Sequence, residues 1–190
     1  MKNLVWLMHT SLDGFVAGPK GEMDWIIVTD AMFEYAKRCT DAADMALYGR
    51  VTWQMMEGYW PTAADKPDAS QHDIDHSRWY NTVAKRVVST SIEGALPANT
   101  KVIGDNLSAE IIRLKQEQGK DILMIGSPSV AHALMAENLI DDYWLFVNPI
   151  LLGQGIPLFK GIKDRAALNL AATDVLPSGV VCLHYQSQHS

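Results

Sequence analysis

Basic residues, cysteines and long hydrophobic runs are all scarce in this sequence. Its 190 residues include 16 Lys and Arg against 22 Asp and Glu, which gives a formal net charge of −6. A phosphate backbone is bound by clustered positive charge, and no run of Lys and Arg is present, so we expect no nucleic-acid partner. No stretch of about 18 apolar residues occurs either, so we expect no transmembrane segment and no membrane partner.

The two cysteines, Cys39 and Cys182, are too few for a disulfide framework. We interpret them as core residues of a protein from a reducing compartment. The apolar run over residues 4–8 is ended by His9 and is too short for the core of a signal peptide. Together these features predict a cytoplasmic protein.

Several motifs of well-known site chemistry are also absent. The chain has no G-x-G-x-x-G, no Walker A lysine, no C-x-x-C and no G-x-S-x-G, which weakens the common nucleotide-binding, thiol-redox and serine-hydrolase interpretations. His72 and His76 stand four residues apart and echo part of H-E-x-x-H. Their segment is polar, the second position is Asp73, and no third ligand is evident, so we expect no metal site.

The composition, 48% hydrophobic and 20% charged, is that of a globular protein. A length of 190 residues suits one domain, and no linker, repeat or low-complexity segment divides the chain. We therefore expect a single domain over residues 1–190.

Up to residue 140, predicted strands alternate with predicted helices. The strands fall at residues 4–8, 44–48, 86–89, 100–103 and 121–126, and the helices at 31–42, 50–57, 107–119 and 128–138. After residue 140 the pattern is mostly strand, at 143–150, 168–176 and 180–185. Residues 58–78 are rich in Asp, Ala and Pro, and we interpret them as a long surface excursion. The order predicts an α/β fold: a mostly parallel central sheet flanked by helices, with antiparallel C-terminal strands.

Small and hydroxyl-bearing residues follow three of the predicted strands. In chain order they are Gly49, Arg50 and Thr52, then Ser89 and Thr90, then Gly126, Ser127 and Ser129. Ligands of open α/β sheets bind at the carboxyl ends of strands, and helix N-termini attract phosphates. Ser127 and Pro128 fit the N-cap and the first position of a helix. The three segments therefore predict either a site for a ligand with several phosphates or ordinary loop and capping structure.

Four further residues are candidates for contact with a substrate. Asp13 follows the first predicted strand, where a carboxylate can relay a proton or bind a substrate hydroxyl or amino group. Asp13-Gly14 is equally a common turn pair. Trp53, Tyr59 and Trp60 follow the loop at Gly49 and can wall a pocket for a flat ring, although most aromatic residues of such a chain pack in its core.

Seven short segments, taken in order, resemble a known family. They are SLDG at residues 11–14, LYGRVTW at 47–53, YWP at 59–61, VVS at 87–89, DILMIGS at 121–127, LIDDY at 139–143 and PILLGQG at 149–155. They resemble the dihydrofolate-reductase-like superfamily and, more closely, the reductase domain of riboflavin biosynthesis, the C-terminal domain of bifunctional deaminase-reductases. The zinc-deaminase signature, H-x-E with P-C-x-x-C, is missing. The chain is therefore similar to a stand-alone member of that family.

The resemblance implies a three-layer α/β/α fold that binds NADPH and passes hydride to a small heterocyclic or aminopyrimidine-type substrate, as in 5-amino-6-(5-phosphoribosylamino)uracil reductase. It assigns Gly49, Arg50 and Thr52 to the dinucleotide loop, Ser89 to the adenosine 2′-phosphate, Gly126 and Ser127 to the pyrophosphate, and Asp13 to the substrate. Many relatives have Gly-Gly where this chain has Gly126-Ser127, so a side chain stands where the phosphates are expected. It also implies a homodimer, and Tyr143, Trp144 and Phe146 suggest apolar surface for the pairing.

Two alternatives stay open. A dihydrofolate reductase proper needs a carboxylate that faces its substrate from the first helix, where Asp30 and Glu34 are the only acids near its start. A non-catalytic nucleotide-binding or sensor module on the same fold would carry similar loops. For either enzyme, Arg50 near Ser89 and Thr90 favours NADPH over NADH, because an Arg can accept the 2′-phosphate.

Overall fold

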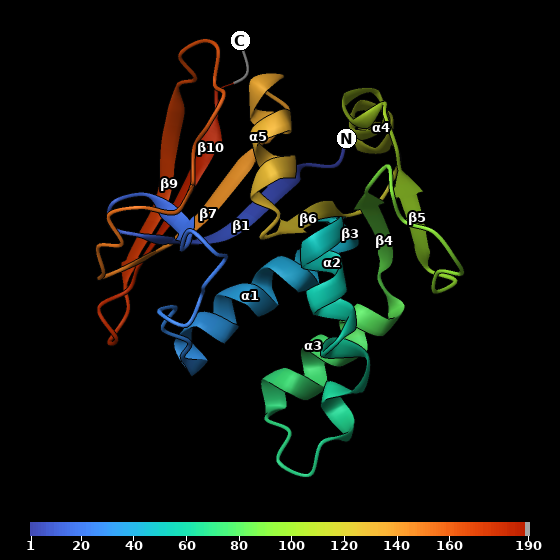
Figure 1. Ribbon diagram of the computed structural model, residues 1–190, viewed down its shortest axis with the longest axis horizontal. Coiled ribbons are helices and arrows are strands. Elements are labelled where there is room, and N and C mark those ends of the chain that lie inside the picture. Colours follow the sequence, from blue (N-terminus) through green and yellow to red (C-terminus); the bar gives the residue numbers. More distant parts are fainter. Residues whose placement is uncertain (189–190) are drawn as a thin grey trace.

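The computed structural model describes residues 1–188, and its largest element is an eight-stranded sheet. The strands are β1 (Leu4–Ser11), β3 (Ala43–Gly49), β4 (Ala84–Val88), β5 (Thr100–Ile103), β6 (Asp121–Ile125), β7 (Asp142–Asn148), β9 (Leu168–Val175) and β10 (Val181–Ser187). Their order across the sheet is β5-β4-β3-β6-β1-β7-β10-β9 (Figure 1). The strands from β5 to β7 are parallel to their neighbours, and β10 and β9 join antiparallel. The predicted α/β fold class is confirmed.

Helices cover both faces of the sheet and complete three layers (Figure 1). They are α1 (Asp30–Ala42), α2 (Arg50–Glu57), the 3-10 helix η1 (Trp60–Asp65), α3 (Gln71–Thr82), α4 (Leu107–Lys115) and α5 (Pro128–Ala136). One face is covered by α4 and α5, and the other by α1, α2 and α3. A small second sheet pairs β2 (Phe15–Ala17) with β8 (Ile156–Pro157), in segments where no strand was predicted.

Side chains of β1 alternate between the two layers, as the period of a strand requires. Trp6 packs in the core with α4 and α5, whereas Leu7 packs with α1 on the opposite face. In β6, Ile122, Leu123 and Met124 are all at most 1% exposed. The continuous apolar run of β6 therefore marks a central strand covered on both faces, as the sequence predicts.

The segment over residues 58–78 is more ordered than the sequence analysis predicts. It contains η1 and the first two turns of α3, which begins at a capping box in which Ser70 and Asp73 each accept a hydrogen bond from the other's backbone N–H. His76, Ser77 and Tyr80 of α3 are buried. The interpretation as a surface excursion is therefore wrong for α3. Its buried side carries polar residues, so it shows no apolar stripe in the sequence.

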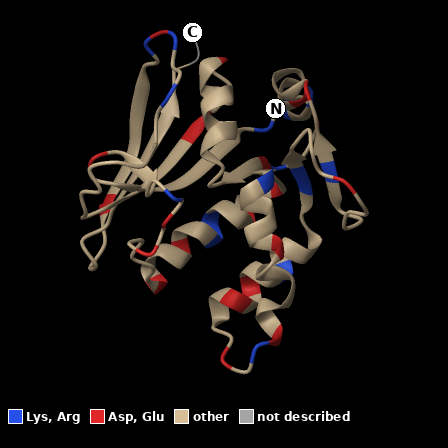
Figure 2. Cartoon of the chain, in the orientation of Figure 1, with Lys and Arg blue, Asp and Glu red and all other residues tan. Residues whose placement is uncertain are grey.

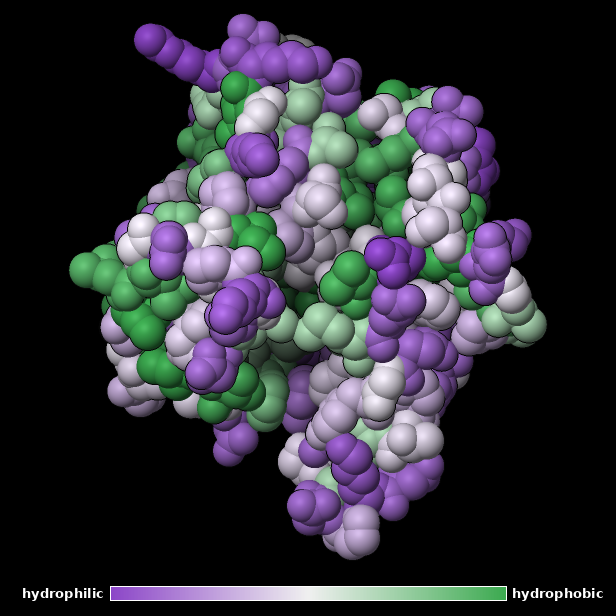
Figure 3. All heavy atoms as spheres, in the orientation of Figure 1, coloured by the Kyte–Doolittle hydropathy of each residue, from purple (hydrophilic) through white to green (hydrophobic). Residues whose placement is uncertain are grey.

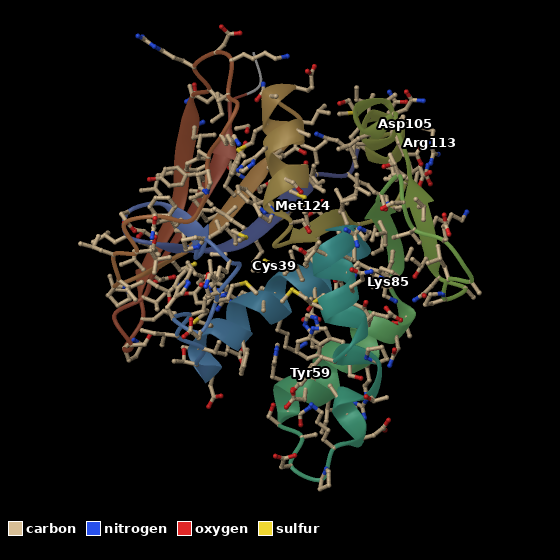
Figure 4. All side chains as sticks on the ribbon, in the orientation of Figure 1. Cys39, Tyr59, Lys85, Asp105, Arg113 and Met124 are labelled. Carbon is tan, nitrogen blue, oxygen red and sulfur yellow. The ribbon has the colours of Figure 1, made fainter. Side chains whose placement is uncertain are left out.

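Two predictions about individual core residues have different outcomes. Cys39 and Cys182 are both buried and unpaired, and Figure 4 places Cys39 on α1 beside the sheet, so their assignment to the core is confirmed. Tyr143 and Phe146 are 5% and 1% exposed within the chain itself, so they are not free surface for pairing with a second copy.

Charges are dispersed over the surface. Figure 2 shows Lys and Arg on several separate elements in this view, without a continuous basic face. Within residues 1–188, no helix combines the length and the hydropathy that a membrane span requires.

Candidate functional site

The carboxyl ends of β3 and β6 lie side by side, and the helices that follow them leave toward opposite faces of the sheet. After β3, α2 packs through Trp53 and Met56 on the face that carries α1 and α3. After β6, α5 packs through Val130 and Leu134 on the other face. Two helix N-termini thus flank the same point of the sheet edge. In open α/β sheets such a switch point is where ligands bind.

Ser127 ties these two strand ends together. Its hydroxyl accepts a hydrogen bond from the backbone N–H of Gly49 at 2.9 Å and donates one to the carbonyl of Ile125 at 3.2 Å. It is the N-cap residue of α5 and Pro128 is the first residue of that helix, as the sequence predicts, but the hydroxyl does not cap its own helix. The Ser127 side chain is buried against β3, and one amide at the start of α2 is already engaged.

The backbone around this junction is tightly fitted. Gly126 and Ser127 both have positive φ, at 62° and 59°. A Cβ atom added at Gly126 would lie 3.3 Å from the methyl carbon of Thr52, and one added at Gly49 would lie 3.1 Å from Val130. The fold therefore brings together Gly49, Thr52, Gly126 and Ser127, as the sequence analysis expects of one site.

The other predicted cofactor residues lie along the same edge. Arg50 is exposed at the start of α2, and its guanidinium donates a hydrogen bond to the Gln54 amide oxygen at 3.3 Å. Ser89 and Thr90 follow β4, the neighbour of β3, and Ser129 is exposed in the first turn of α5. The first turns of α2 and α5 carry no acidic residue. A basic side chain, hydroxyls and two helix N-termini suit a phosphate-bearing ligand.

Asp13 lies just after β1, and its side chain forms hydrogen bonds with the loop that follows β7. Its carboxylate accepts hydrogen bonds from the Ser11 hydroxyl at 2.6 Å, the Leu152 N–H at 3.1 Å and the Gly153 N–H at 2.7 Å. The Ser11 hydrogen bond contributes most to lowering the pKa of Asp13, and the two amides add to it. Asp13 is therefore an anion at neutral pH, better suited to accept a hydrogen bond than to donate a proton.

An apolar pocket of about 160 Å³ opens on the α1 face, beside the ends of β1 and β6. The residues that line it come from seven elements and the loop before α1: Leu7, His9, Val28, Met32, Phe33, Ala36, Met56, Trp60, His72, His76, Ile125 and Phe146. Ile125 directly precedes Gly126, and the Gly126 N–H donates to the carbonyl of Leu7 at 3.1 Å. The pocket therefore adjoins the junction at Gly126.

Aromatic rings form two walls of this pocket. On the sheet side, His9 stacks on Phe146 with 5.1 Å between ring centroids. On the helix side, Phe33 stacks on His72 at 3.7 Å, and Trp60 lies 4.0 Å from His76. We refer to the twelve lining residues as the aromatic pocket.

Of the three aromatic residues predicted to contact a substrate, only Trp60 lines the aromatic pocket. Trp53 packs against Tyr48 and Tyr80 in the core below α2. Tyr59 is 40% exposed and donates a hydrogen bond to Asp73, and Figure 4 shows it over α3. Asp30 and Glu34 are exposed on α1, and neither lines the pocket.

The three histidines of the pocket were not predicted as site residues. Burial lowers the pKa of His9 to about 4 and that of His76 to about 3, and it also lowers the pKa of His72. All three are therefore neutral at pH 7. The capping box at Ser70 and Asp73 was the available signal for the helix that carries His72 and His76.

Comparison with known proteins identifies the family. The family model of the RibD C-terminal domain matches residues 2–182. The chain belongs to the RibD C-terminal domain family. It is 31% identical to the uncharacterized protein YyaP of Bacillus subtilis over 97% of this chain and 94% of that protein.

Solved structures of more distantly related proteins have the same fold as this RibD C-terminal domain protein. The diaminohydroxyphosphoribosylaminopyrimidine deaminase/5-amino-6-(5-phosphoribosylamino)uracil reductase of Thermotoga maritima is 14% identical, with a TM-score of 0.67 over 98% of this chain and 57% of that one. A dihydrofolate reductase from Enterococcus faecalis, complexed with NADP(H), is 13% identical, with a TM-score of 0.64 over 98% and 97% of the two chains. The dihydrofolate-reductase-like fold is thereby confirmed.

Proposed function

We propose that this RibD C-terminal domain protein is an NADPH-dependent reductase whose hydride acceptor is a small planar heterocycle. The observation that carries the proposal is the junction of β3 and β6, where Arg50 and two helix N-termini follow the strand ends and where Ile125, which lines the aromatic pocket, directly precedes Gly126. The fold is shared with a dihydrofolate reductase that was solved with NADP(H) and with a diaminohydroxyphosphoribosylaminopyrimidine deaminase/5-amino-6-(5-phosphoribosylamino)uracil reductase.

The residues present suit this cofactor. The exposed Arg50 guanidinium can pair with a 2′-phosphate, and the hydroxyls of Ser89 and Thr90 lie on the adjacent strand end. Thr52, Gly126 and Ser129 lie around the switch point, and the Ser127 side chain there is buried. When bound there, NADPH supplies the hydride, and the protein supplies binding, orientation and exclusion of water.

The substrate side is assigned to the aromatic pocket together with Asp13. The pocket offers stacking faces for a flat ring. Asp13 stands at the end of β1 as an anion that can accept a hydrogen bond from a substrate hydroxyl or amino group. A dihydrofolate reductase proper is disfavoured, because none of the twelve lining residues is an Asp or a Glu.

Titration with NADPH and with NADH tests the cofactor. We expect NADPH to bind more tightly, and Arg50→Ala to weaken NADPH by about 1.5–3 kcal/mol, the cost of a lost charged hydrogen bond, with little effect on NADH. Arg78→Ala is the matched control, since it removes an exposed Arg from α3 instead. Equal affinity of the unaltered protein for both cofactors would refute the assignment.

Turnover is then measured as NADPH oxidation with a panel of aminopyrimidines, pteridines and quinones. Oxidation that depends on one of these acceptors supports a reductase. Tight cofactor binding with no oxidation across the whole panel would instead favour the non-catalytic nucleotide-binding module.

A further inference from the structure

Both polar backbone groups of Gly126 are bonded to β1, the strand beside β6 (Figure 1). The Gly126 N–H donates a hydrogen bond to the carbonyl of Leu7 at 3.1 Å. The Gly126 carbonyl accepts one from the indole N–H of Trp6 at 2.8 Å, across 120 residues of sequence. The turn between β6 and α5 is therefore held by a neighbouring strand as well as by the side chain of Ser127.

The Trp6 indole is a donor in a fixed position. Trp6 is 0% exposed and packs in the core with α4 and α5. Its ring meets that of Tyr143 edge-on, with 6.0 Å between the centroids and 73° between the planes. An indole nitrogen can only donate, and a buried donor needs an acceptor. A donor fixed in this way holds the Gly126 carbonyl turned toward the core.

The direction of this carbonyl decides what the turn offers to an anion. The Gly126–Ser127 peptide is trans, so the N–H of Ser127 points away from Trp6. Among residues 1–188, no group accepts a hydrogen bond from this N–H. If the peptide turned over, the carbonyl oxygen would take the place of the N–H. Backbone N–H groups attract a phosphate, whereas a carbonyl oxygen carries negative partial charge and repels it.

The backbone at Ser127 does not favour the observed orientation by itself. Its φ of 59° lies in the left-handed region, which the Cβ atom disfavours. Turning the peptide over would bring φ of Ser127 to negative values, and Gly126 tolerates the positive φ of either form. The observed turn therefore needs contacts that hold it. Trp6 bonds to the oxygen that such a rotation would move.

We propose that Trp6 is a positioning residue of the cofactor site. Its indole N–H keeps the Gly126 carbonyl turned into the core, so that the turn before α5 does not present this oxygen to the phosphates of a dinucleotide. Trp6 acts through the Gly126–Ser127 peptide and contacts neither cofactor nor substrate. The inference rests on the proposed reductase function, because it concerns the binding of the same cofactor.

The first test removes the donor. Trp6→Phe keeps an apolar ring, and should weaken NADPH binding about three- to tenfold in calorimetric titration, the effect of one lost hydrogen bond. Leu4→Ala is the matched control, because it truncates another fully buried side chain of β1 in the same core. It should destabilise the protein in urea unfolding, yet leave NADPH affinity within about twofold. Unchanged affinity in Trp6→Phe, or equal weakening in Leu4→Ala, would overturn the proposal.

A second variant separates the hydrogen bond from the packing of the ring. The tryptophan analogue 3-benzothienylalanine, inserted at position 6 alone, keeps both fused rings and carries sulfur in place of the N–H. It should weaken NADPH as Trp6→Phe does, with a smaller loss of stability, and it decides the question if Trp6→Phe does not fold. Full NADPH affinity in this variant would contradict the role of the indole N–H.

The ligand 2′-AMP provides a readout that general damage to the site would not give. It carries the 2′-phosphate assigned to Arg50 but no pyrophosphate, so Trp6→Phe should leave its affinity unchanged. Equal losses for 2′-AMP and NADPH would overturn the proposal. If 2′-AMP does not compete with NADPH on the unaltered protein, the assignment of Arg50 fails, and the comparison with Leu4→Ala decides the role of Trp6. If NADPH does not bind the unaltered protein, the reductase function and the role of Trp6 fail together; if it binds, the variants at position 6 test Trp6 alone.

Discussion

Replacement of Ser127 by alanine should destabilise the protein, because it removes the hydrogen-bond acceptor of a backbone N–H that lies 78 residues earlier in the sequence. The Ser127 hydroxyl is the acceptor for the buried backbone N–H of Gly49 at 2.9 Å. Alanine removes that acceptor and leaves the N–H unsatisfied between β3 and β6. It also removes the donor to the Ile125 carbonyl. The left-handed backbone at position 127, with φ of 59°, is unchanged by this substitution.

The magnitude follows from these contacts. A buried donor left without a partner costs about 1–3 kcal/mol, so Ser127→Ala should lower the free energy of unfolding by about 2 kcal/mol. Ser127→Gly loses the same hydrogen bonds, but glycine adopts positive φ without the penalty of about 1 kcal/mol that a Cβ atom imposes. The glycine variant should therefore be more stable than the alanine variant by roughly 1 kcal/mol.

Urea and thermal unfolding of the cofactor-free protein measure both changes. For a chain of this length, about 2 kcal/mol corresponds to a fall in melting temperature of roughly 4–8 °C. Ser129→Ala is the control: it makes the same change two residues later, at an exposed side chain, and should stay within about 0.5 kcal/mol of the unaltered protein. The reasoning is refuted if Ser127→Ala is as stable as Ser129→Ala, or if Ser127→Gly is the less stable of the two variants at position 127.

Three other predictions concern Asp13, the pocket histidines and the quaternary structure. Asp13→Asn should keep NADPH affinity and reduce turnover about 10–100-fold with an acceptor found in the panel, the effect of a lost hydrogen bond to a charged group. Unchanged turnover would leave Asp13 only its turn and loop contacts. His9 and His76 have pKa values near 4 and 3 in the folded protein, against 6.5 for an exposed histidine, so the unfolded chain binds more protons below pH 6.5. The free energy of unfolding should therefore fall as the pH drops from 6.5 toward 4, by about 2 kcal/mol per histidine at pH 5. Denaturation at several pH values should show a shallower fall for His76→Phe than for the unaltered protein. An identical fall would contradict the lowered pKa of His76. We also propose a homodimer, because β9 is exposed along almost its whole length and Figure 3 shows hydrophobic residues gathered on the side of the loop after β7 and the β9–β10 connection. Leu151 and Val175 there are 69% and 76% exposed, and sedimentation at micromolar concentration that gives only a 21.1 kDa species would reject the dimer.

Local sequence was sufficient for much of the fold. The buried strand β6 was predicted because its apolar run has no polar interruption, and Ser127-Pro128 was predicted as a helix start because proline is preorganised at the first helical position. The residues at the ends of β3 and β6 were predicted as one site for a related reason. Parallel strands end at the same edge of a sheet, so the alternation of strands and helices already implies that these ends lie near one another.

Only the tertiary structure decided which partners these residues have. The sequence marks Ser127 as an N-cap, but its backbone is left-handed and not extended as in a usual N-cap, and its hydroxyl binds the Gly49 N–H that the pairing of β3 with β6 brings beside it. The segment of His72 and His76 is polar, so no hydrophobic period reveals that α3 packs beside α1. His9, on β1, meets these two histidines in one pocket only after the sheet and three helices are assembled. Hydrophobic period and capping residues act over a few positions, whereas contacts between distant segments depend on strand order, which local sequence does not encode.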